Sequence, residues 1–410
     1  MRVIYSFGVF FYGLLIRLAS LWNAKAKLWL IGRKDVLSRI ENDLKNNDSN
    51  IVWIHSASLG EFEQGRPLIE SLKQKYPELK IFLTFFSPSG YEIRKDYPLA
   101  DYIYYLPEDT VSNARQFVKL VTPQIAVFIK YEYWYNYMNE LNNAEIPQIF
   151  ISGIFRPKQP FFKFYGGWFL NHLKNVEHFF VQNEDSVQLL KKSGIDSVSK
   201  SGDTRFDRVA EITAKVEANA IVEEFKNDRK LFLGGSTWSP DEQIIKGLHV
   251  QQPGLKIIIA PHLIDENHIQ QIEELFPNSI RYSKAKDASL KEIPVLIIDN
   301  MGMLSSLYQY ANFAMIGGGF GVGIHNTLEA ATFGMPIFIG PNYQKFQEAK
   351  DLLRLGVVNV VHDAAELNQA VSVLLDDVEK WNTIALQSKQ YVESNIGATQ
   401  MILEFIENQL

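Results

Sequence analysis

The sequence predicts an α/β protein with two doubly wound domains in tandem. The chain has 410 residues, which is more than one ordinary core holds. Its apolar content of 46% and its charged content of 21% are typical of a globular protein. Short apolar runs alternate with longer amphipathic stretches, and this alternation occurs in two successive series. Such a pattern predicts parallel sheets whose strands are joined by crossover helices.

The first series predicts a Rossmann-like domain over residues 35–210. Its expected strands are Ile51–Ile54, Ile81–Thr84, Tyr102–Tyr105, Ile125–Ile129, Gln148–Ile151 and His178–Val181. Between these strands lie helix-length segments such as Phe62–Lys75 and Ser89–Lys95. Each apolar run is short enough for a buried strand, and each intervening segment is long enough for a helix.

The second series predicts another Rossmann-like domain over residues 229–394. Its expected strands are Leu231–Gly234, Lys256–Ala260, Val295–Ile298, Phe313–Ile316 and Pro336–Ile339. A polar helix over residues 210–225 is expected to belong to a linker at residues 211–228. Residues 395–410 predict an amphipathic helix that crosses back to the first domain. Two such domains are expected to face one cleft, which the carboxyl ends of both sheets line and where the ligand binds.

Charge and residue content exclude several classes of function. The net charge of -6 argues against a nucleic-acid-binding protein. The chain has no Cys, which excludes disulfides, thiolate nucleophiles and Cys-ligated metals. The sequence also lacks an HExxH motif, a DxD arrangement in a suitable loop and a GxSxG motif, and its eight His are scattered. We therefore expect neither a bound metal nor a Ser nucleophile.

Residues 1–34 form a basic, apolar segment without Asp or Glu. The stretch Val3–Ile16 is uncharged and mostly apolar, but Arg17 interrupts the ~20 apolar residues that a membrane-spanning helix needs. No clear cleavage site for a secretory signal follows. The pattern favours a helix in the membrane interface, with Trp22 and Trp29 at headgroup depth and basic residues facing anionic lipid on the cytoplasmic side. A buried N-terminal helix is the alternative.

Glu61 is the best-placed reactive group of the first domain. Residues 53–65 read WIHSASLGEFEQG, which predicts a strand, a Gly-containing turn and the start of a helix. A carboxylate there lies at the edge of a parallel sheet where α/β proteins bind ligands. The positive end of the helix keeps it ionised and available as a base. The same residues also match a capping box, in which Ser58 and Glu61 bond free backbone N–H groups.

The densest functional motif lies at residues 316–341, which read IGGGFGVGIHNTLEAATFGMPIFIGP. Glycines let a backbone approach a phosphate closely, and the helix start that follows offers N–H groups to an anion. Glu329 of that helix can accept hydrogen bonds from ribose hydroxyls. The Gly spacing does not match the dinucleotide fingerprint. The alternative is a Gly-rich turn followed by a helix-capping Asn.

Other strand-to-helix loops carry polar residues that are weaker evidence for a binding site. The hydroxyls of Ser236 and Thr237 suit a phosphate or carboxylate, but a plain helix cap would use the same residues. His262 follows a strand, where a single His is more often a packed polar residue than a catalyst. Lys130 and Glu132 set a cation and an anion beside aromatic residues, or form an internal ion pair.

Taken together and in order, these motifs resemble the 3-deoxy-D-manno-oct-2-ulosonic acid (Kdo) transferases of Gram-negative bacteria. The motifs are HSASLGE, SPSG, KYEYWYN, VQNEDS, GDTRFD, GGSTWSPDE, DNMGML, IGGG, HNTLEAA and GP. They run from about Trp53 to Phe346. The resemblance implies a GT-B fold and an inverting reaction that needs neither metal nor cofactor. It also implies CMP-Kdo as donor and the lipid A precursor as acceptor, at the cytoplasmic face of the inner membrane.

The resemblance further implies roles for individual residues. The glutamate that serves the family as general base falls on Glu61. The expected donor-binding residues are Ser236, Thr237, Pro261, His262, Met301, Gly302, Gly318, Gly319, His325, Asn326 and Glu329. The expected acceptor or cleft residues are Ser58, Gly60, Ser87, Lys130, Glu132 and Arg205.

Some positions depart from the family pattern. Lys130 stands where the family usually has the first of two glutamates, and Glu132 is the second. The arginine of an Asn-Ala-Arg segment is missing, although Arg156 is close. Arg205 replaces a lysine, and the motif at Pro261 lacks its arginine. The departures in the first domain bear on the acceptor more than on the reaction.

Two other functions remain open from the sequence. One is a different enzyme on the same fold, such as a nucleotide-sugar epimerase, which would have no use for a basic apolar N-terminus. The other is a non-catalytic, membrane-associated binding protein, which would need no base at position 61. Release of CMP from CMP-Kdo, with and without the lipid acceptor, separates the three.

Overall fold

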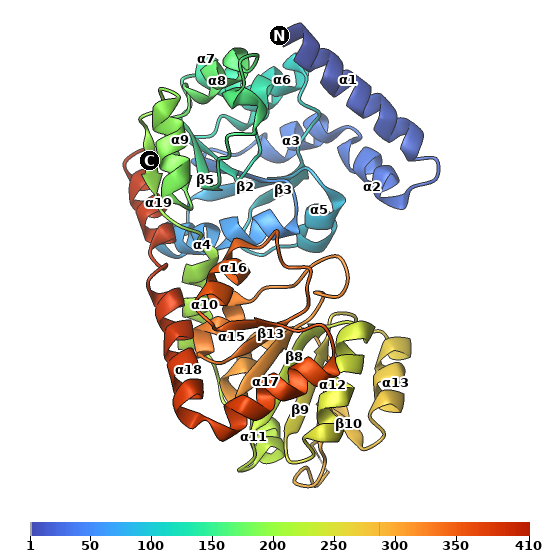
Figure 1. Ribbon diagram of the computed structural model, residues 1–410. Coiled ribbons are helices and arrows are strands. Elements are labelled where there is room, and N and C mark those ends of the chain that lie inside the picture. Colours follow the sequence, from blue (N-terminus) through green and yellow to red (C-terminus); the bar gives the residue numbers. More distant parts are fainter. Residues whose placement is uncertain (1, 287) are drawn as a thin grey trace. The chain divides into compact units, whose positions relative to one another are not determined.

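The computed structural model describes residues 2–286 and 288–410, so Met1 of the expected N-terminal segment lies outside the described residues. The chain divides into two compact units (Figure 1). Unit 1 comprises Met1–Asp207 and Ile396–Leu410, and unit 2 comprises Arg208–Asn395. Each unit is built on one parallel sheet with helices on its faces. The predicted α/β class with two parallel sheets is confirmed.

Unit 1 has the strand order β3-β2-β1-β4-β5-β6-β7, and neighbouring strands pair in parallel. Its strands are β1 (Ile51–Ser56), β2 (Lys80–Phe85), β3 (Tyr102–Tyr105), β4 (Ile125–Ile129), β5 (Gln148–Gly153), β6 (His178–Val181) and β7 (Val198–Lys200). Its helices are α1 (Arg2–Ala19), α2 (Ala24–Arg33), α3 (Val36–Leu44), α4 (Leu59–Lys75), α5 (Pro88–Arg94), α6 (Val111–Val121), α7 (Tyr135–Asn143), the 3-10 turn η1 (Pro160–Phe162), α8 (Gly167–Leu173), α9 (Glu184–Lys192) and α19 (Ala398–Glu407).

The two faces of this sheet bury separate apolar clusters. Along β1, Ile51 and Trp53 point into one cluster, which includes side chains of α3, α6, α7 and α9. Val52 and Ile54 point into the other, which includes side chains of α4 and α19. Because successive side chains of a strand point to opposite faces, a continuously apolar strand requires helices on both sides.

The C-terminal helix α19 is held in unit 1 by apolar packing and by a carboxylate. Ile402 and Ile406 are fully buried against the sheet. At the helix start, Asp207 accepts hydrogen bonds from the backbone N–H of Gly397 at 2.5 Å and of Thr399 at 2.7 Å. A carboxylate at this end of a helix satisfies free N–H groups and complements the helix dipole.

Unit 2 has the strand order β10-β11-β9-β8-β12-β13-β14, again in parallel pairs. Its strands are β8 (Leu231–Thr237), β9 (Lys256–Pro261), β10 (Ser279–Arg281), β11 (Val295–Ile297), β12 (Phe313–Ile316), β13 (Ile337–Ile339) and β14 (Val358–Val360). Its helices are α11 (Ala220–Lys226), α12 (Ser239–Gln251), α13 (Glu266–Leu275), η2 (Tyr282–Lys284), α14 (Leu304–Leu307), η3 (Tyr308–Tyr310), α15 (Leu328–Phe333), α16 (Gln347–Arg354), α17 (Ala364–Asp376) and α18 (Val378–Glu393). Helix α10 (Arg205–Ala214) contains the boundary between the units.

Two features differ from the sequence prediction. The polar stretch at residues 210–225 is not one helix, because α10 ends at Ala214 and Asn219 caps the start of α11 through its side chain. Strands β7, β10 and β14 were not predicted. Each has three residues and lies at an edge of its sheet, so none carries the continuous apolar run that marks a buried strand.

Candidate functional site

Glu61 lies in the first turn of α4, beyond the carboxyl end of β1. Ser58 precedes the helix with an extended backbone (φ -143°, ψ 174°), but its side chain bonds no backbone N–H group. Its hydroxyl instead donates to Oε2 of Glu61 at 2.5 Å. The capping-box interpretation is therefore wrong. Glu61 is partly exposed, so its carboxylate is held by a neighbouring hydroxyl and is accessible to a ligand.

The loops after β1 and β2 lie together at this edge of unit 1. The backbone N–H of Ser87 donates to the carbonyl of Ala57 at 2.7 Å. Ser87 itself caps α5, because its Oγ accepts from the N–H of Ser89. Gly60 is exposed, and a Cβ placed there would make only ordinary contact with Ser58. The predicted acceptor residues Ser58, Gly60 and Ser87 thus belong to two adjoining loops.

Asp203 is the centre of a buried polar network at the same edge. Its Oδ2 accepts hydrogen bonds from the side-chain amides of Gln64 at 2.7 Å and Gln182 at 3.1 Å. The guanidinium of Arg205 pairs with the same carboxylate at 2.8 Å. Burial by itself would raise the pKa of Asp203, but Arg205 and the nearby Lys130 hold that pKa below its ordinary value. The predicted cation Arg205 therefore serves at least in part to balance a buried carboxylate.

The Tyr131 hydroxyl interacts with the charges of both Glu61 and Arg156. Burial raises the pKa of the Tyr131 hydroxyl, Arg156 opposes this through charge and a hydrogen bond, and the negative charge of Glu61 adds to the rise. Arg156 and Glu61 thus both act on the Tyr131 hydroxyl. Arg156 is exposed. Arg156, which lies close to the missing arginine of the family pattern, thus reaches Tyr131 from the loop that follows β5.

Glu132 is part of a second buried network. Its Oε2 accepts from the indole N–H of Trp134 at 2.8 Å and lies 3.1 Å from Nε2 of His55. The other ring nitrogen of His55 lies 2.8 Å from the Thr84 hydroxyl, which also accepts from the indole N–H of Trp53. Glu132 is 9% exposed, and its hydrogen bonds fix the Trp134 ring. Glu132 therefore shapes this edge from inside the unit.

Left-handed backbone marks three strand ends. Lys130 after β4, Ser152 in β5 and Ser236 in β8 have φ values of 60°, 54° and 52°. Such values are uncommon for residues other than glycine and are costly unless the surrounding structure enforces them. All three positions lie at the carboxyl end of a sheet, and strained backbone of this kind clusters at functional sites.

In unit 2, three aromatic rings stack where β8, β9 and β12 end. The His262 ring lies 4.8 Å from the Trp238 ring and 4.4 Å from the His325 ring, with small interplanar angles of 27° and 25°. The indole N–H of Trp238 donates to Nε2 of His325 at 3.1 Å. Burial, and then the neighbouring His262, lower the pKa of His325 to about 4. The ring of His325 is therefore neutral at pH 7, and its proton is on Nδ1.

The Gly-rich loop after β12 packs against other backbone. Gly318 has a φ of 89°, and its N–H donates to Oδ2 of Asp241 at 3.0 Å. The same oxygen accepts from the N–H of Trp238 at 2.9 Å. A Cβ on Gly319 would lie 2.6 Å from the backbone nitrogen of Gly340. These glycines let the loops after β8, β12 and β13 approach one another more closely than side chains allow.

Glu329 and Asn326 form one hydrogen-bonded group, which also bonds Ser305 of α14, the helix that follows Met301. The side-chain amide of Asn326 donates to Oε1 of Glu329 at 3.1 Å, and its Oδ1 accepts from the N–H of Leu328 at 3.1 Å. Oε2 of Glu329 accepts from the hydroxyl of Ser305 at 2.6 Å. Met301 is 81% exposed, and the next residue has a φ of 89°. Asn326 thus both caps a helix start, as the alternative interpretation held, and orients Glu329.

The other predicted donor residues differ in accessibility. Thr237 is fully buried, and its hydroxyl donates to Oε1 of Glu242 at 3.0 Å. That carboxylate also lies 3.0 Å from Nε2 of His268. Pro261 is the buried last residue of β9. Ser236 is partly exposed. Of the Ser236–Thr237 pair, only Ser236 is therefore accessible from outside the unit.

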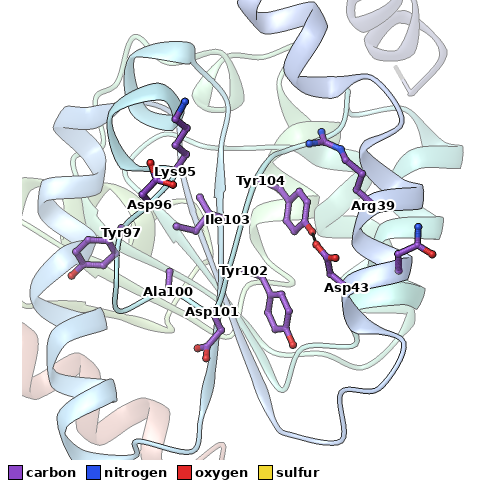
Figure 2. A pocket seen from close by; sticks show the side chains of 11 residues that line it. Arg39, Asp43, Lys95, Asp96, Tyr97, Ala100, Asp101, Tyr102, Ile103 and Tyr104 are labelled. Atoms are coloured by element: carbon purple, nitrogen blue, oxygen red, sulfur yellow. Dashed lines mark hydrogen bonds between the residues drawn. The ribbon is translucent and has the colours of Figure 1, made fainter.

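A hollow that none of these residues lines lies beside the edge strand β3. Figure 2 shows this hollow of about 490 Å³, between the end of α3 and the segment after α5. Tyr104 donates a hydrogen bond to Asp43, and Asp101 pairs with Lys73 and Lys80 at 3.0 and 2.9 Å. Two of its carboxylates, Asp43 and Asp101, are thus bonded within the unit. No predicted site residue lines it.

The N-terminal helix α1 exposes most of its large apolar side chains. Val3, Phe7, Phe10 and Leu18 are 50 to 67% exposed, and Trp22 beyond the helix is 76% exposed. An exposed apolar face of this extent is not that of a buried helix, and it is typical of a surface that contacts lipid or another molecule. Among the described helices, none is both long enough and apolar enough to span a bilayer.

Two residues of the basic apolar segment are not on this exposed face. Trp29 is buried, and the guanidinium of Arg33 stacks 3.8 Å above its ring centre. Arg33 donates to the carbonyls of Leu106 and Phe86, both at 2.8 Å. The prediction that Trp29 lies at headgroup depth is therefore wrong, and Arg33 does not face lipid. Both side chains instead attach α2 to the rest of unit 1.

Comparisons with known proteins show which proteins this chain resembles. The family model described as 3-deoxy-D-manno-octulosonic-acid transferase (kdotransferase) matches residues 33–208. A 3-deoxy-D-manno-octulosonic acid transferase of Rickettsia bellii (strain RML369-C) is 28% identical over 398 residues, which cover 92% of this chain and 93% of the relative. A 3-deoxy-D-manno-octulosonic acid transferase of Haemophilus influenzae is 25% identical over 380 residues, which cover 88% of this chain and 87% of the relative. Over most of its length the chain is therefore similar to Kdo transferases, which are glycosyltransferases.

Solved structures show the fold that this chain shares with other proteins. UDP-GlcNAc 2-epimerase from Neisseria meningitidis has a TM-score of 0.60 at 16% identity and covers 88% of this chain and 100% of its own. MurG of Acinetobacter baumannii has a TM-score of 0.56 at 13% identity, covering 88% and 99%. These likenesses support the predicted GT-B type. In residues 2–286 and 288–410, no group of three or more His, Asp or Glu is placed to hold a metal ion.

Proposed function

We propose that this chain transfers Kdo from CMP-Kdo to the lipid A precursor, with Glu61 as the general base. The observation that carries the proposal is the position, exposure and hydrogen bonding of the Glu61 carboxylate. Its carboxylate lies at the ligand-binding edge of unit 1, is partly exposed, and accepts a hydrogen bond from Ser58 instead of capping its own helix. A carboxylate in that setting is oriented and unblocked, as proton abstraction requires.

The donor half of the proposal rests on unit 2. Its Gly-rich loop brings backbone N–H groups to the carboxyl end of the sheet, where α/β proteins bind nucleotides. Glu329, held by Asn326 and Ser305, has carboxylate oxygens that suit ribose hydroxyls. The neutral His325 offers its Nδ1–H as a donor to a phosphate or carboxylate oxygen. We assign the CMP moiety to these residues and to Ser236.

The reaction is a single displacement. Glu61 takes the proton of the acceptor hydroxyl as that oxygen forms a bond to the anomeric carbon of Kdo. The bond from the anomeric carbon to the phosphate oxygen breaks on the opposite face, and CMP leaves with the electron pair, so the configuration inverts. Because the leaving group is a phosphate, N–H groups and cations can stabilise its charge without a dedicated acid or a metal.

The acceptor half of the proposal is a lipid at the cytoplasmic face of the inner membrane. The exposed apolar face of α1 and the exposed Trp22 support attachment to a membrane surface. Arg156, which bonds Tyr131, is a cation for an anionic group of the acceptor.

The test uses purified full-length protein, CMP-Kdo and the lipid A precursor, and it measures CMP release and product mass. Glu61→Gln should lower the transfer rate by about 10²–10⁴-fold while CMP binding persists. Glu63→Gln is the matched control, because Glu63 lies on the same helix but pairs with Arg94 at 2.8 Å. Near-normal turnover of Glu61→Gln would overturn the base assignment. CMP release that does not depend on the acceptor would favour an epimerase or a hydrolase.

A further inference from the structure

An apolar cavity of about 390 Å³ lies between α1 and the body of unit 1. Tyr5, Gly8, Val9 and Tyr12 line it, and their spacing shows that one face of α1 forms a wall. The opposite walls include aromatic residues of α2 and of the loops after β2 and β4. Its volume falls in the range of about 300–1,000 Å³ that is usual for small-molecule sites.

The acidic groups at this cavity are already paired. Asp109 accepts from the Tyr5 hydroxyl at 2.5 Å and from the backbone N–H groups of Asn136 and Tyr137 at 3.2 and 3.1 Å. Glu108 pairs with Arg17 at 3.1 Å. Because these partners occupy the carboxylates, the surface that the cavity offers to a ligand is mainly hydrocarbon and aromatic.

Aromatic contacts connect the cavity to the acceptor edge. The ring of Phe86 lies 5.9 Å from that of Trp29 and 4.8 Å from that of Trp134, and all three rings line the cavity. The indole of Trp134 in turn donates to Glu132. Phe86 immediately precedes Ser87, whose N–H bonds the loop that carries Ser58. The cavity therefore adjoins the loops that hold the proposed base.

We infer that this cavity binds one acyl chain of the lipid acceptor. The inference rests on the proposed function, since it names the part of the substrate that this site holds. A hydrocarbon chain matches the apolar walls, and each methylene group that leaves water contributes favourably. The exposed apolar side of α1 gives the remaining chains a membrane surface beside the cavity. One chain held there would position the sugar head near Glu61.

Gly8 allows the cavity to be filled by a single substitution. It lines the cavity, and a Cβ built on it meets no heavy atom within 4 Å. Gly8→Phe should therefore place a ring in the space that the chain would use. Val3→Phe is the matched control, because Val3 is 67% exposed and lies on the other side of the same helix. Gly8→Leu provides a smaller filling group if the Phe variant folds poorly.

The kinetic test compares two acceptors, the acylated lipid A precursor and the same sugar phosphate with its chains removed. Gly8→Phe should raise KM for the acylated acceptor by about tenfold or more, the change expected from losing roughly two buried methylene groups. Its KM for CMP-Kdo and its rate with the deacylated acceptor should equal those of the wild type and of Val3→Phe. An unchanged KM for the acylated acceptor would overturn the inference.

A binding test separates this inference from the proposed function. Trp29 and Trp134 line the cavity, so bound 9,10-dibromostearic acid should quench their fluorescence relative to unbrominated stearic acid. Quenching should occur in the wild type and in Val3→Phe and be lost in Gly8→Phe. If the wild type transfers Kdo to neither acceptor, the proposed function fails, and quenching still decides whether the cavity takes an acyl chain. Equal quenching in all three proteins, or reduced vesicle binding by Gly8→Phe with normal acceptor KM, would overturn the inference.

Discussion

The hydroxyl of Ser58 donates a hydrogen bond to Oε2 of Glu61, 2.5 Å away, in the first turn of α4. The two residues have the spacing of a capping box, yet they bond each other rather than the free N–H groups of the helix. This hydrogen bond occupies one carboxylate oxygen of Glu61 and fixes the orientation of the carboxylate. The other oxygen is then free to face a substrate hydroxyl in a defined direction.

Replacing Ser58 by Ala should impair the reaction more than binding. A hydrogen bond to a charged group contributes about 1.5–3 kcal/mol, so the loss of orientation should lower kcat by roughly tenfold or more. KM for CMP-Kdo should not change, because Ser58 belongs to the other unit. Ser58→Thr keeps a hydroxyl and should restore most of the rate. A Ser58→Ala enzyme with normal kcat would show that the bond does not orient the base.

Adding a methyl group to Gly319 should weaken nucleotide binding. The new Cβ would lie 2.6 Å from the backbone nitrogen of Gly340, so the loop after β12 or β13 must move. Calorimetric titration with CMP should show affinity lower by about tenfold or more, as expected when a preorganised loop is displaced. Gly321→Ala is the control, since its Cβ would make only an ordinary contact, 3.7 Å from the carbonyl oxygen of Gly318. Equal CMP affinity in both variants would argue against this loop as the phosphate site.

His325 should make the stability of the protein depend on pH in the acidic range. Its folded-state pKa is about 4, because burial and the neighbouring His262 disfavour the charged ring, whereas an unfolded His titrates near 6.5. Between about pH 6.5 and pH 4 the unfolded chain therefore binds the extra proton, and stability falls as the pH falls. The loss should be complete near pH 4, where the folded ring also begins to take the proton.

Denaturant unfolding of the wild type and of His325→Gln across this range checks the prediction. The free energy of unfolding of the wild type minus that of His325→Gln should be constant above about pH 6.5. It should decrease as the pH is lowered from about 6.5 to about 4. Subtraction removes the contribution of the other titrating groups. A difference that does not vary with pH would show that His325 titrates normally in the folded protein.

Asp207 should be needed to hold the C-terminal helix. Its carboxylate accepts from the N–H and the hydroxyl of Thr399 at 2.7 and 2.6 Å and from the N–H of Gly397 at 2.5 Å. Loss of a helix-start carboxylate costs about 0.5–2 kcal/mol. Asp207→Ala should therefore speed hydrogen exchange in Ala398–Glu407 without affecting the central strands. Glu211→Ala, at a half-exposed position in α10, should leave that exchange unchanged.

Much of the fold could be predicted from the chain alone because its signals are local. Runs such as Ile125–Ile129 and Phe313–Ile316 are continuously apolar and match the observed strands. In a parallel sheet with helices on both faces, each buried strand must be apolar throughout, so its position is written in the composition of a few consecutive residues. The edge strands β7, β10 and β14 escaped prediction because they are short and only partly buried.

Local sequence also placed Glu61 and Glu329 near the starts of helices that follow strands, because the strand, the turn and the helix start are consecutive. It could not give their partners. Gln64 and Asp203 are 139 positions apart, and no spacing in the chain predicts their hydrogen bond. The same holds for Trp29 and Thr237, whose side chains suit a membrane surface or a phosphate by type but are buried. Residue type and period determine which side of an element a group occupies, whereas its burial and its partner depend on distant segments that only the folded chain brings together.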